Sequence, residues 1–169
     1  GGMLRYGIPE YRLPKAVLDE EIATIEAMGV EIITNTKIGE DIPFETVQED
    51  FDAVLLGIGA WVSTGVGCKG EDAEGVIGGI DFLRKVVRNE EIKLGEKVAI
   101  VGGGNTAMDA CRTAVRLGAK EVYNIYRRTK DEMPADMVEI EEAEEEGVIF
   151  KNLTNPLEVI KDEKGHVKE

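Results

Sequence analysis

A glycine-rich turn between a short apolar strand and a helix is the feature that most constrains how this chain can fold. Residues 98–101 are apolar, Gly102, Gly103 and Gly104 follow, and apolar residues recur at helical spacing over residues 106–117. Gly118 stands where a helix commonly ends, and residues 122–126 read as a second strand. The pattern predicts one βαβ unit of about thirty residues, the length of a mononucleotide-binding half.

The glycine turn fits the phosphate-binding sequence G-x-G-x-x-A over residues 102–107. Gly102 permits the sharp turn out of the strand, Gly104 lets the backbone approach a pyrophosphate, and the small Ala107 lets the helix pack close to the sheet. The free N–H groups at the start of the helix, from Thr106 on, then face the phosphates. We therefore predict a dinucleotide site; the alternative is a glycine turn that only packs and binds nothing.

Two arginines follow the second strand. NAD-binding proteins usually carry an acidic residue about twenty residues beyond the loop, to hold the ribose hydroxyls. This chain has Arg127 and Arg128 instead, and guanidinium groups pair with a 2′-phosphate by bidentate hydrogen bonds. We predict a preference for NADPH; the alternative is that the pair only makes the strand end soluble. Lys130 either adds to the same pocket or is an ordinary surface lysine.

Hydrophobic spacing and the positions of glycine and proline predict the remaining elements. We expect a loop over residues 1–15 and a flexible glycine-rich crossing near residues 61–80, which is the candidate domain boundary. Helices are predicted over residues 16–28, 80–87 and 135–146. Strands are predicted over residues 30–33, 51–58 and 148–150, with an antiparallel hairpin over residues 157–167. The strand at 51–58 is apolar on both faces, which suits the interior of a parallel sheet.

Charge and cysteine content exclude several classes of function. The chain of 169 residues carries 34 Asp and Glu against 20 Lys and Arg, a net charge of −14, so nucleic acid is not an expected ligand. The longest apolar run, residues 53–62, is half of the roughly 20 residues that span a membrane, and no signal peptide opens the chain. Cys68 and Cys111 form no metal-ligand pattern, so we predict reduced structural cysteines, no metal and a cytoplasmic protein.

Six glutamates crowd the last predicted helix, between residues 139 and 146. Such a run is usually a solvated helix face, and a docking surface for a basic partner protein is the alternative. No nucleophile–His–acid arrangement is visible, so we predict no catalytic side chain. The chain also opens Gly-Gly-Met, from which we expect an internal fragment of a longer polypeptide.

Four stretches together resemble the small (beta) subunit family of NADPH-dependent glutamate synthase, whose members are FAD-dependent pyridine nucleotide oxidoreductases. Residues 1–15 (GGMLRYGIPEYRLPK) are similar to the family's flavin-side loop, and residues 51–61 (FDAVLLGIGAW) to its strand that ends under the flavin. Residues 98–128 resemble its NADPH-binding unit, and Met-Pro-Ala at 133–135 precedes an acidic helix as in the family. The resemblance covers almost the whole chain.

The resemblance implies an α/β fold like that of thioredoxin reductase. A Rossmann-like NAD(P)-binding domain, with a parallel sheet flanked by helices and an antiparallel hairpin, would be inserted in a partial FAD-binding domain. Residues 1–80 would belong to the FAD part and residues 81–169 to the NADPH domain, truncated at its C-terminus. By motif, the pyrophosphate would be held by Gly102, Gly104, Asn105, Thr106 and Ala107, the 2′-phosphate by Arg127 and Arg128, and the flavin would lie near Gly2, Leu4, Gly59 and Ala60.

The resemblance also implies the reaction. Hydride would pass from NADPH to FAD, and electrons would continue through iron–sulfur clusters, not in this segment, to a large (alpha) subunit that makes glutamate from glutamine and 2-oxoglutarate. A ferredoxin–NADP transhydrogenase or a pyrimidine reductase could use the same module with an equivalent electron acceptor, and a non-catalytic nucleotide-binding or assembly module is a further alternative. Because the family's first FAD glycine loop is missing here, we expect weak or no FAD binding and an inactive isolated fragment.

Overall fold

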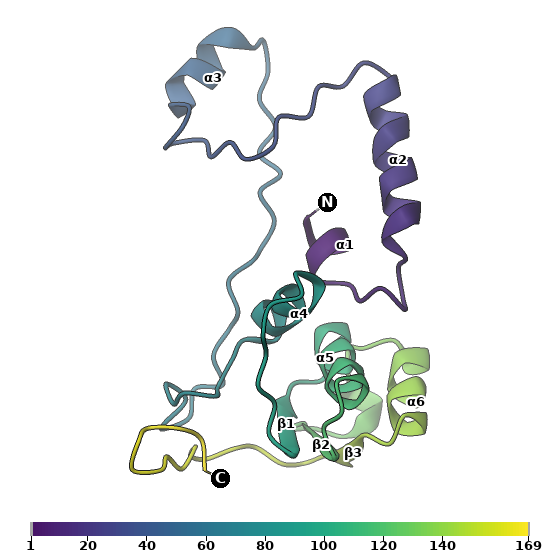
Figure 1. Cartoon of the computed structure of the whole chain (residues 1–169), viewed down its shortest axis with the longest axis vertical. Coiled ribbons are helices and arrows are strands. Elements are labelled where there is room, and N and C mark those ends of the chain that lie inside the picture. The colour runs from purple at the N-terminus through teal and green to yellow at the C-terminus, as the bar shows by residue number, and fades with distance from the viewer. Residues whose placement is uncertain (1, 169) are drawn as a thin grey trace. The chain divides into compact units, whose positions relative to one another are not determined.

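The computed structural model describes residues 2–168, which divide into two compact units (Figure 1). Unit 1 contains the chain up to Pro14 and from Trp61 onward, and unit 2 contains residues 15–60. These units are defined by contacts within the chain and not by which cofactor each would bind. The expected division into an FAD part, residues 1–80, and an NADPH part, residues 81–169, therefore stays a prediction.

A three-stranded parallel sheet forms the centre of unit 1. Its strands are β1 (Lys97–Val101), β2 (Glu121–Ile125) and β3 (Ile149–Lys151), in the order β1-β2-β3. Val98 lies opposite Val122, and Tyr123 lies opposite Ile149. Helix α5 (Asn105–Arg116) connects β1 to β2 and packs on both strands, while α6 (Met137–Glu145) precedes β3. The predicted βαβ unit and the α/β parallel-sheet class are thus confirmed.

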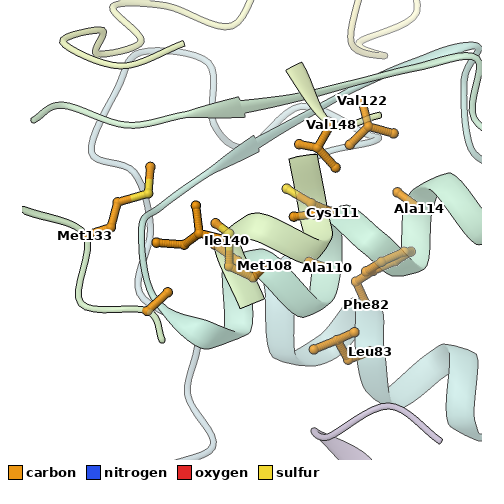
Figure 2. Close-up of a cluster of buried hydrophobic side chains, with 13 residues drawn as sticks. Phe82, Leu83, Met108, Ala110, Cys111, Ala114, Val122, Met133, Ile140 and Val148 are labelled. Atoms are coloured by element: carbon orange, nitrogen blue, oxygen red, sulfur yellow. The ribbon is translucent and has the colours of Figure 1, made fainter. Parts of the chain in front are cut away.

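Helix α5 is buried on most of its surface (Figure 2). Met108, Cys111 and Ala114 are fully enclosed between the sheet and the helices α4 (Gly79–Val87) and α6. The small residues on this helix bring its backbone close to its neighbours, because short side chains need little space. Burial raises the pKa of the Cys111 thiol to about 12, so this cysteine is neutral and structural, as predicted.

The outer face of α5 is fastened by ion pairs rather than by apolar contact. Arg112, only 5% exposed, reaches Glu139 at 2.8 Å and Glu146 at 2.9 Å. Arg116 reaches Glu146 at 2.7 Å. Glu142 also pairs with Arg112, so three carboxylates of the glutamate run face α5. The interpretation of the glutamate run as a solvated face is therefore wrong for the side of α6 that faces α5. The glutamate run alone could not reveal that two arginines, one turn apart on α5, lie opposite it.

The segment before Pro14 is held on the same face of unit 1. Arg12 donates two hydrogen bonds to the carboxylate of Asp109, at 2.8 and 3.0 Å, and lies 2.7 Å from Glu139. The Tyr11 ring stacks under the guanidinium groups of Arg112 and Arg116, with 4.6 and 3.9 Å to its centroid. Burial raises the pKa of Asp109 despite its Arg12 partner. The residues that were predicted to form a loop are thus fixed to α5 and α6.

Short helices account for further differences from the predicted elements. Part of the predicted N-terminal loop is α1 (Gly2–Tyr6), which packs near α4, and the Tyr6 ring meets Trp61 edge-on at 6.4 Å. In unit 2, α2 (Lys15–Ala27) agrees with the predicted helix, and Gly29 after it takes the left-handed conformation, φ +95°. A short helix α3 (Phe44–Asp50) was not predicted.

The predicted strands at 30–33 and 51–58 are not formed in the described chain. Residues 51–58 form neither helix nor strand and are exposed; the side chains of Leu55 and Ile58 are 95% and 82% accessible. A strand is held by hydrogen bonds to a neighbouring strand, and within residues 2–168 no segment pairs with this one. The prediction of a strand buried inside a parallel sheet is therefore wrong for these residues.

The predicted C-terminal hairpin is confirmed only in part, at its turn over residues 162–165. Residues 157–167 contain one antiparallel bridge, Lys161 to Val167, and no paired strands. Two parallel bridges instead tie the segment to the glycine-rich crossing, Lys69 to Glu158 and Glu74 to His166. Backbone N–H groups of residues 157–167 therefore bond to the glycine-rich segment, so they do not form a longer hairpin ladder. Over the described residues, no helix is long and apolar enough to cross a membrane.

The buried arginine of α5 makes a stability prediction. Arg112→Ala removes a buried guanidinium group that pairs with Glu139, Glu142 and Glu146. Glu139 keeps Arg12 and Glu146 keeps Arg116, so we expect the free energy of unfolding to fall by about 1–3 kcal/mol, less than for a carboxylate left without any partner. The control is Lys120→Ala, which removes an exposed ion pair with Glu96 and should cost less than about 1 kcal/mol. Urea denaturation of both variants measures the difference. Equal losses of unfolding free energy would contradict the conclusion that the ion pairs of Arg112 stabilise the packing of α6 on α5.

Acid should weaken the same network. Hydrogen bonds from Arg116 and Arg112 hold the pKa of Glu146 below its ordinary value of 4.5. Because the folded state holds this proton more weakly than the unfolded state, the ion pair stabilises the protein above about pH 4.5 and loses its contribution as pH falls through the lowered pKa. Glu146→Gln should flatten the acid limb of a plot of unfolding free energy against pH, whereas Glu141→Gln, on an exposed position of α6, should leave it unchanged.

Candidate functional site

The three glycines of the turn between β1 and α5 differ in what surrounds them. Gly102 has φ +144°, and a Cβ atom there would lie 3.3 Å from the Cβ of Ala107. A Cβ atom on Gly103 would lie 2.5 Å from the Tyr126 ring, which the chain cannot accommodate without moving that ring. A Cβ atom on Gly104 would meet nothing within 4 Å. The turn therefore packs tightly on its inner side and is open at Gly104, where a ligand can approach the backbone.

The first turn of α5 presents unused donors at this open side. The Gly104 carbonyl accepts from the N–H groups of Ala107 and Met108, at 2.9 and 3.2 Å. Across the described part of the chain, no acceptor bonds the backbone N–H groups of Gly104, Asn105 and Thr106. No side chain caps this helix either, since its N-cap residue is Gly104. Free N–H groups at the positive end of a helix dipole are suited to a phosphate.

The turn is held on its inner side by strand β2. Gly102 donates its N–H to the Ile125 carbonyl at 3.0 Å, and the Gly102 carbonyl accepts from the Asn124 side chain at 2.8 Å. Asn124 is fully buried, where a polar side chain is costly unless it is hydrogen-bonded. Its hydrogen bond to Gly102 therefore fixes the peptide at which the chain leaves the sheet. Sequence reasoning assigned no role to Asn124 or to Gly103, because both depend on contacts across the sheet.

The outer side of the turn is held by the segment that leads into α6. Ala135 donates its N–H to the Gly103 carbonyl at 3.1 Å. The amide of Asn105 accepts from the Asp136 N–H at 2.9 Å and donates to the Asp136 carboxylate at 3.0 Å. Asn105 was predicted to hold the pyrophosphate. Its side chain instead binds Asp136, which leaves its backbone N–H for that role.

Arg127 and Arg128 lie directly after β2, at the carboxyl ends of the parallel strands, where α/β folds bind ligands. Both side chains are exposed. Among residues 2–168 neither guanidinium group makes an ion pair or a side-chain hydrogen bond, whereas Arg12, Arg112 and Arg116 are all paired. Lys130 is held by Glu144 at 2.6 Å, so its charge is neutralised. The two arginines therefore remain as available cations beside the glycine turn.

The residues predicted to lie near flavin belong to two units. Gly2 and Leu4 are on α1 in unit 1, and Gly59 and Ala60 end unit 2. Gly2 and Gly59 both have positive φ, +53° and +70°. The flavin role of these four residues stays a prediction. The described residues hold no cluster of three or more potential metal ligands.

Comparisons with known proteins show which family this chain is related to. Residues 45–169 match the model of the pyridine nucleotide-disulphide oxidoreductase family. The chain is 47% identical, over 99% of its length, to the NADP(+)-dependent formate dehydrogenase subunit beta of Moorella thermoacetica and to the NADPH-Fe(3+) oxidoreductase subunit beta of Geobacter sulfurreducens. It is 42% identical, over 95% of its length, to the glutamate synthase [NADPH] small chain of Halomonas elongata.

The chain covers only part of each relative: 24%, 25% and 36% of their respective lengths. A solved structure of a mutant FprA from Mycobacterium tuberculosis has a similar fold, with a TM-score of 0.77 at 18% identity, over 98% of this chain and 52% of that one. The resemblance to glutamate synthase small subunits is therefore confirmed at the level of sequence similarity. By its family match, this chain belongs to the pyridine nucleotide-disulphide oxidoreductases.

Proposed function

We propose that unit 1 binds NADPH and forms part of a flavin-dependent oxidoreductase. The observation that carries this proposal is the exposed, unpaired pair Arg127 and Arg128 beside the open glycine turn. The free N–H groups from Gly104 to Thr106 would hold the pyrophosphate, and the two arginines would hold the 2′-phosphate. The residues present thus fit both charged groups of a phosphorylated dinucleotide, the central pyrophosphate and the 2′-phosphate.

The protein's contribution to such a reaction is position and electrostatics. When bound, NADPH supplies the hydride, and a flavin accepts it in this class of enzyme. The turn and the arginines would fix the nucleotide half of NADPH, and thereby the point from which the nicotinamide extends. We assign no proton transfer to a side chain, in line with the absence of a catalytic residue from the sequence prediction.

The described residues do not by themselves fit a complete flavin site. Their one glycine phosphate turn lies at residues 102–104, and the segment predicted to lie under the flavin, residues 51–58, is exposed and unpaired. FAD binding in the whole protein remains part of the proposal, with Gly2, Leu4, Gly59 and Ala60 as its proposed contacts. For this chain we expect weak binding or none.

The electron acceptor is proposed from the relatives. Their names share NADP(H) and a place as one subunit or chain of a larger enzyme, but they differ in formate dehydrogenase, Fe(3+) oxidoreductase and glutamate synthase. We therefore propose a partner subunit that receives the electrons. The large subunit of glutamate synthase, which makes glutamate from glutamine and 2-oxoglutarate, is one candidate. The two subunits of 47% identity make formate or iron chemistry equally consistent with this module.

A non-catalytic assembly module is the less favoured alternative. It would use the glutamate run of α6 to dock a basic partner. Glu139, Glu142 and Glu146 already pair with arginines of α5, and Glu144 pairs with Lys130. Four of the six carboxylates are thus engaged inside unit 1, which leaves a small charge for docking.

Charge reversal of both arginines tests the cofactor preference. We expect Arg127→Glu with Arg128→Glu to raise the dissociation constant for NADPH by at least about tenfold and to change that for NADH far less, because only NADPH carries the 2′-phosphate. Isothermal titration with both nucleotides measures this. The control is Lys93→Glu with Lys120→Glu, which makes the same change in net charge at two exposed positions. Equal losses for both nucleotides would show that the arginines are not a 2′-phosphate site.

The visible absorbance spectrum tests the flavin expectation. The chain should purify without a stoichiometric flavin band and should still respond to NADPH in a titration, since its nucleotide turn is formed while its flavin segment is unpaired. Added FAD, separated on a desalting column, should not remain with the protein. Retention of one FAD per chain would contradict the expectation, and a lack of response to NADPH would contradict the proposed function itself.

A further inference from the structure

Asp136 is placed as a helix cap but does not act as one. It is the N-cap residue of α6, with φ −59° and ψ 136°, and its carboxylate caps none of the free N–H groups of its own helix. N-cap aspartates commonly bond these groups, which stabilises a helix by about 1 kcal/mol. The carboxylate of Asp136 instead accepts from the Asn105 amide, 31 positions earlier in the chain. The structure thus uses this side chain to hold the glycine turn rather than α6.

The contact with Asn105 is the end of a longer attachment. We call residues 129–136 the strap. The strap begins with a capping box, in which Thr129 and Glu132 bond each other, and the Tyr126 hydroxyl donates to the Glu132 carbonyl at 2.9 Å. Met133 in its middle is buried in the core (Figure 2). Its far end is fixed by the hydrogen bond from Ala135 to Gly103 and by the Asn105–Asp136 pair. The strap is therefore bound at its start, middle and end.

The strap connects the two places that the proposed function assigns to phosphates. Arg127 and Arg128 immediately precede it, and the glycine turn is bound to its other end. The 2′-phosphate and the pyrophosphate belong to one nucleotide, so their separation varies little. A protein that binds both must hold its two sites at a matching distance, and small misplacements are costly. The strap and its final contact supply such a constraint.

The charge of Asp136 indicates that its hydrogen bond to Asn105 is the reason for a carboxylate at this position. A carboxylate beside a phosphate site repels the ligand, so the charge alone lowers nucleotide affinity. Asp136 is exposed, and its side chain is thus not needed to fill the core. We propose that Asp136 is a positioning residue that, through Asn105, holds the arginines at the distance from the glycine turn that NADPH requires and NADH does not. This inference rests on the proposed NADPH site.

Two substitutions separate the charge of Asp136 from its hydrogen bond. Asp136→Asn removes the charge and keeps an oxygen that accepts from Asn105, whereas Asp136→Ala removes both. We expect D136N to bind NADPH as tightly as the parent chain or tighter. D136A should bind NADPH about three- to tenfold more weakly than D136N, the range for one lost hydrogen bond, with a smaller change for NADH. Titrations of the full chain with NADPH and NADH measure both values.

Controls address folding and location. Asp136→Ser keeps a good N-cap residue but has a side chain too short to replace the carboxylate, so it should behave like D136A even where Ala weakens α6. Asp131→Ala removes another exposed carboxylate of the strap and should not reduce NADPH affinity. Circular dichroism of each variant reports whether the fold is retained.

Amide hydrogen exchange gives a readout without nucleotide. The Ala135 N–H, which bonds Gly103, should exchange faster in D136A and D136S than in the parent chain or D136N. Equal gains in NADPH affinity for D136N and D136A would show that Asp136 acts by charge alone and would overturn the proposal. Equal losses for NADPH and NADH in D136A would overturn the specificity role. If the parent chain binds neither nucleotide, the proposed function fails, and the role of Asp136 in NADPH specificity fails with it. The exchange rates at Ala135 are measured without nucleotide, so they still show whether Asp136 holds the glycine turn.

Discussion

The close approach of α5 to strands β1 and β2 is the contact on which the rest of unit 1 depends. Small residues along α5 permit it, and its first turn can start so near the sheet only because Gly102 adopts φ +144° beside Ala107. A larger side chain at either position would move the helix and with it the free N–H groups that face a ligand. Core packing and the proposed anion site are thus one structural feature, set by the same few residues.

A second set of contacts encloses α5 from outside the sheet. Arg112 and Arg116 draw the glutamates of α6 onto the helix, and Arg12 brings the N-terminal segment to Asp109 on the same side. Because buried charges are costly without partners, these groups also specify how the elements meet: an alternative packing would leave charges unpaired. Apolar packing thus determines how closely α5 approaches the sheet. The ion pairs determine which segments pack on the side of α5 that faces away from the sheet.

The βαβ unit and the turn could be predicted because local residues determine them: strand, glycines, helix and Gly118 follow one another in sequence. The pairing of Asn105 with Asp136, and the need for glycine at 103, could not, since each depends on residues more than twenty positions away. The strand at residues 51–58 failed for the opposite reason. Its apolar composition suited a buried strand, but a strand also requires a partner to pair with, which composition does not report.

The net charge of −14 acquires a different meaning once the ion pairs are known. Charges separated by more than a Debye length of about 8 Å at physiological salt are largely screened, so the groups near the turn matter more than the total. Near it, arginines neutralise glutamates of α6 and Glu144 neutralises Lys130. Among the described residues at the carboxyl ends of β2 and β3, Arg127, Arg128 and Lys151 are exposed and make no ion pair. An acidic protein can therefore present a local positive site, and the acidic residues sharpen it by pairing with the other cations nearby.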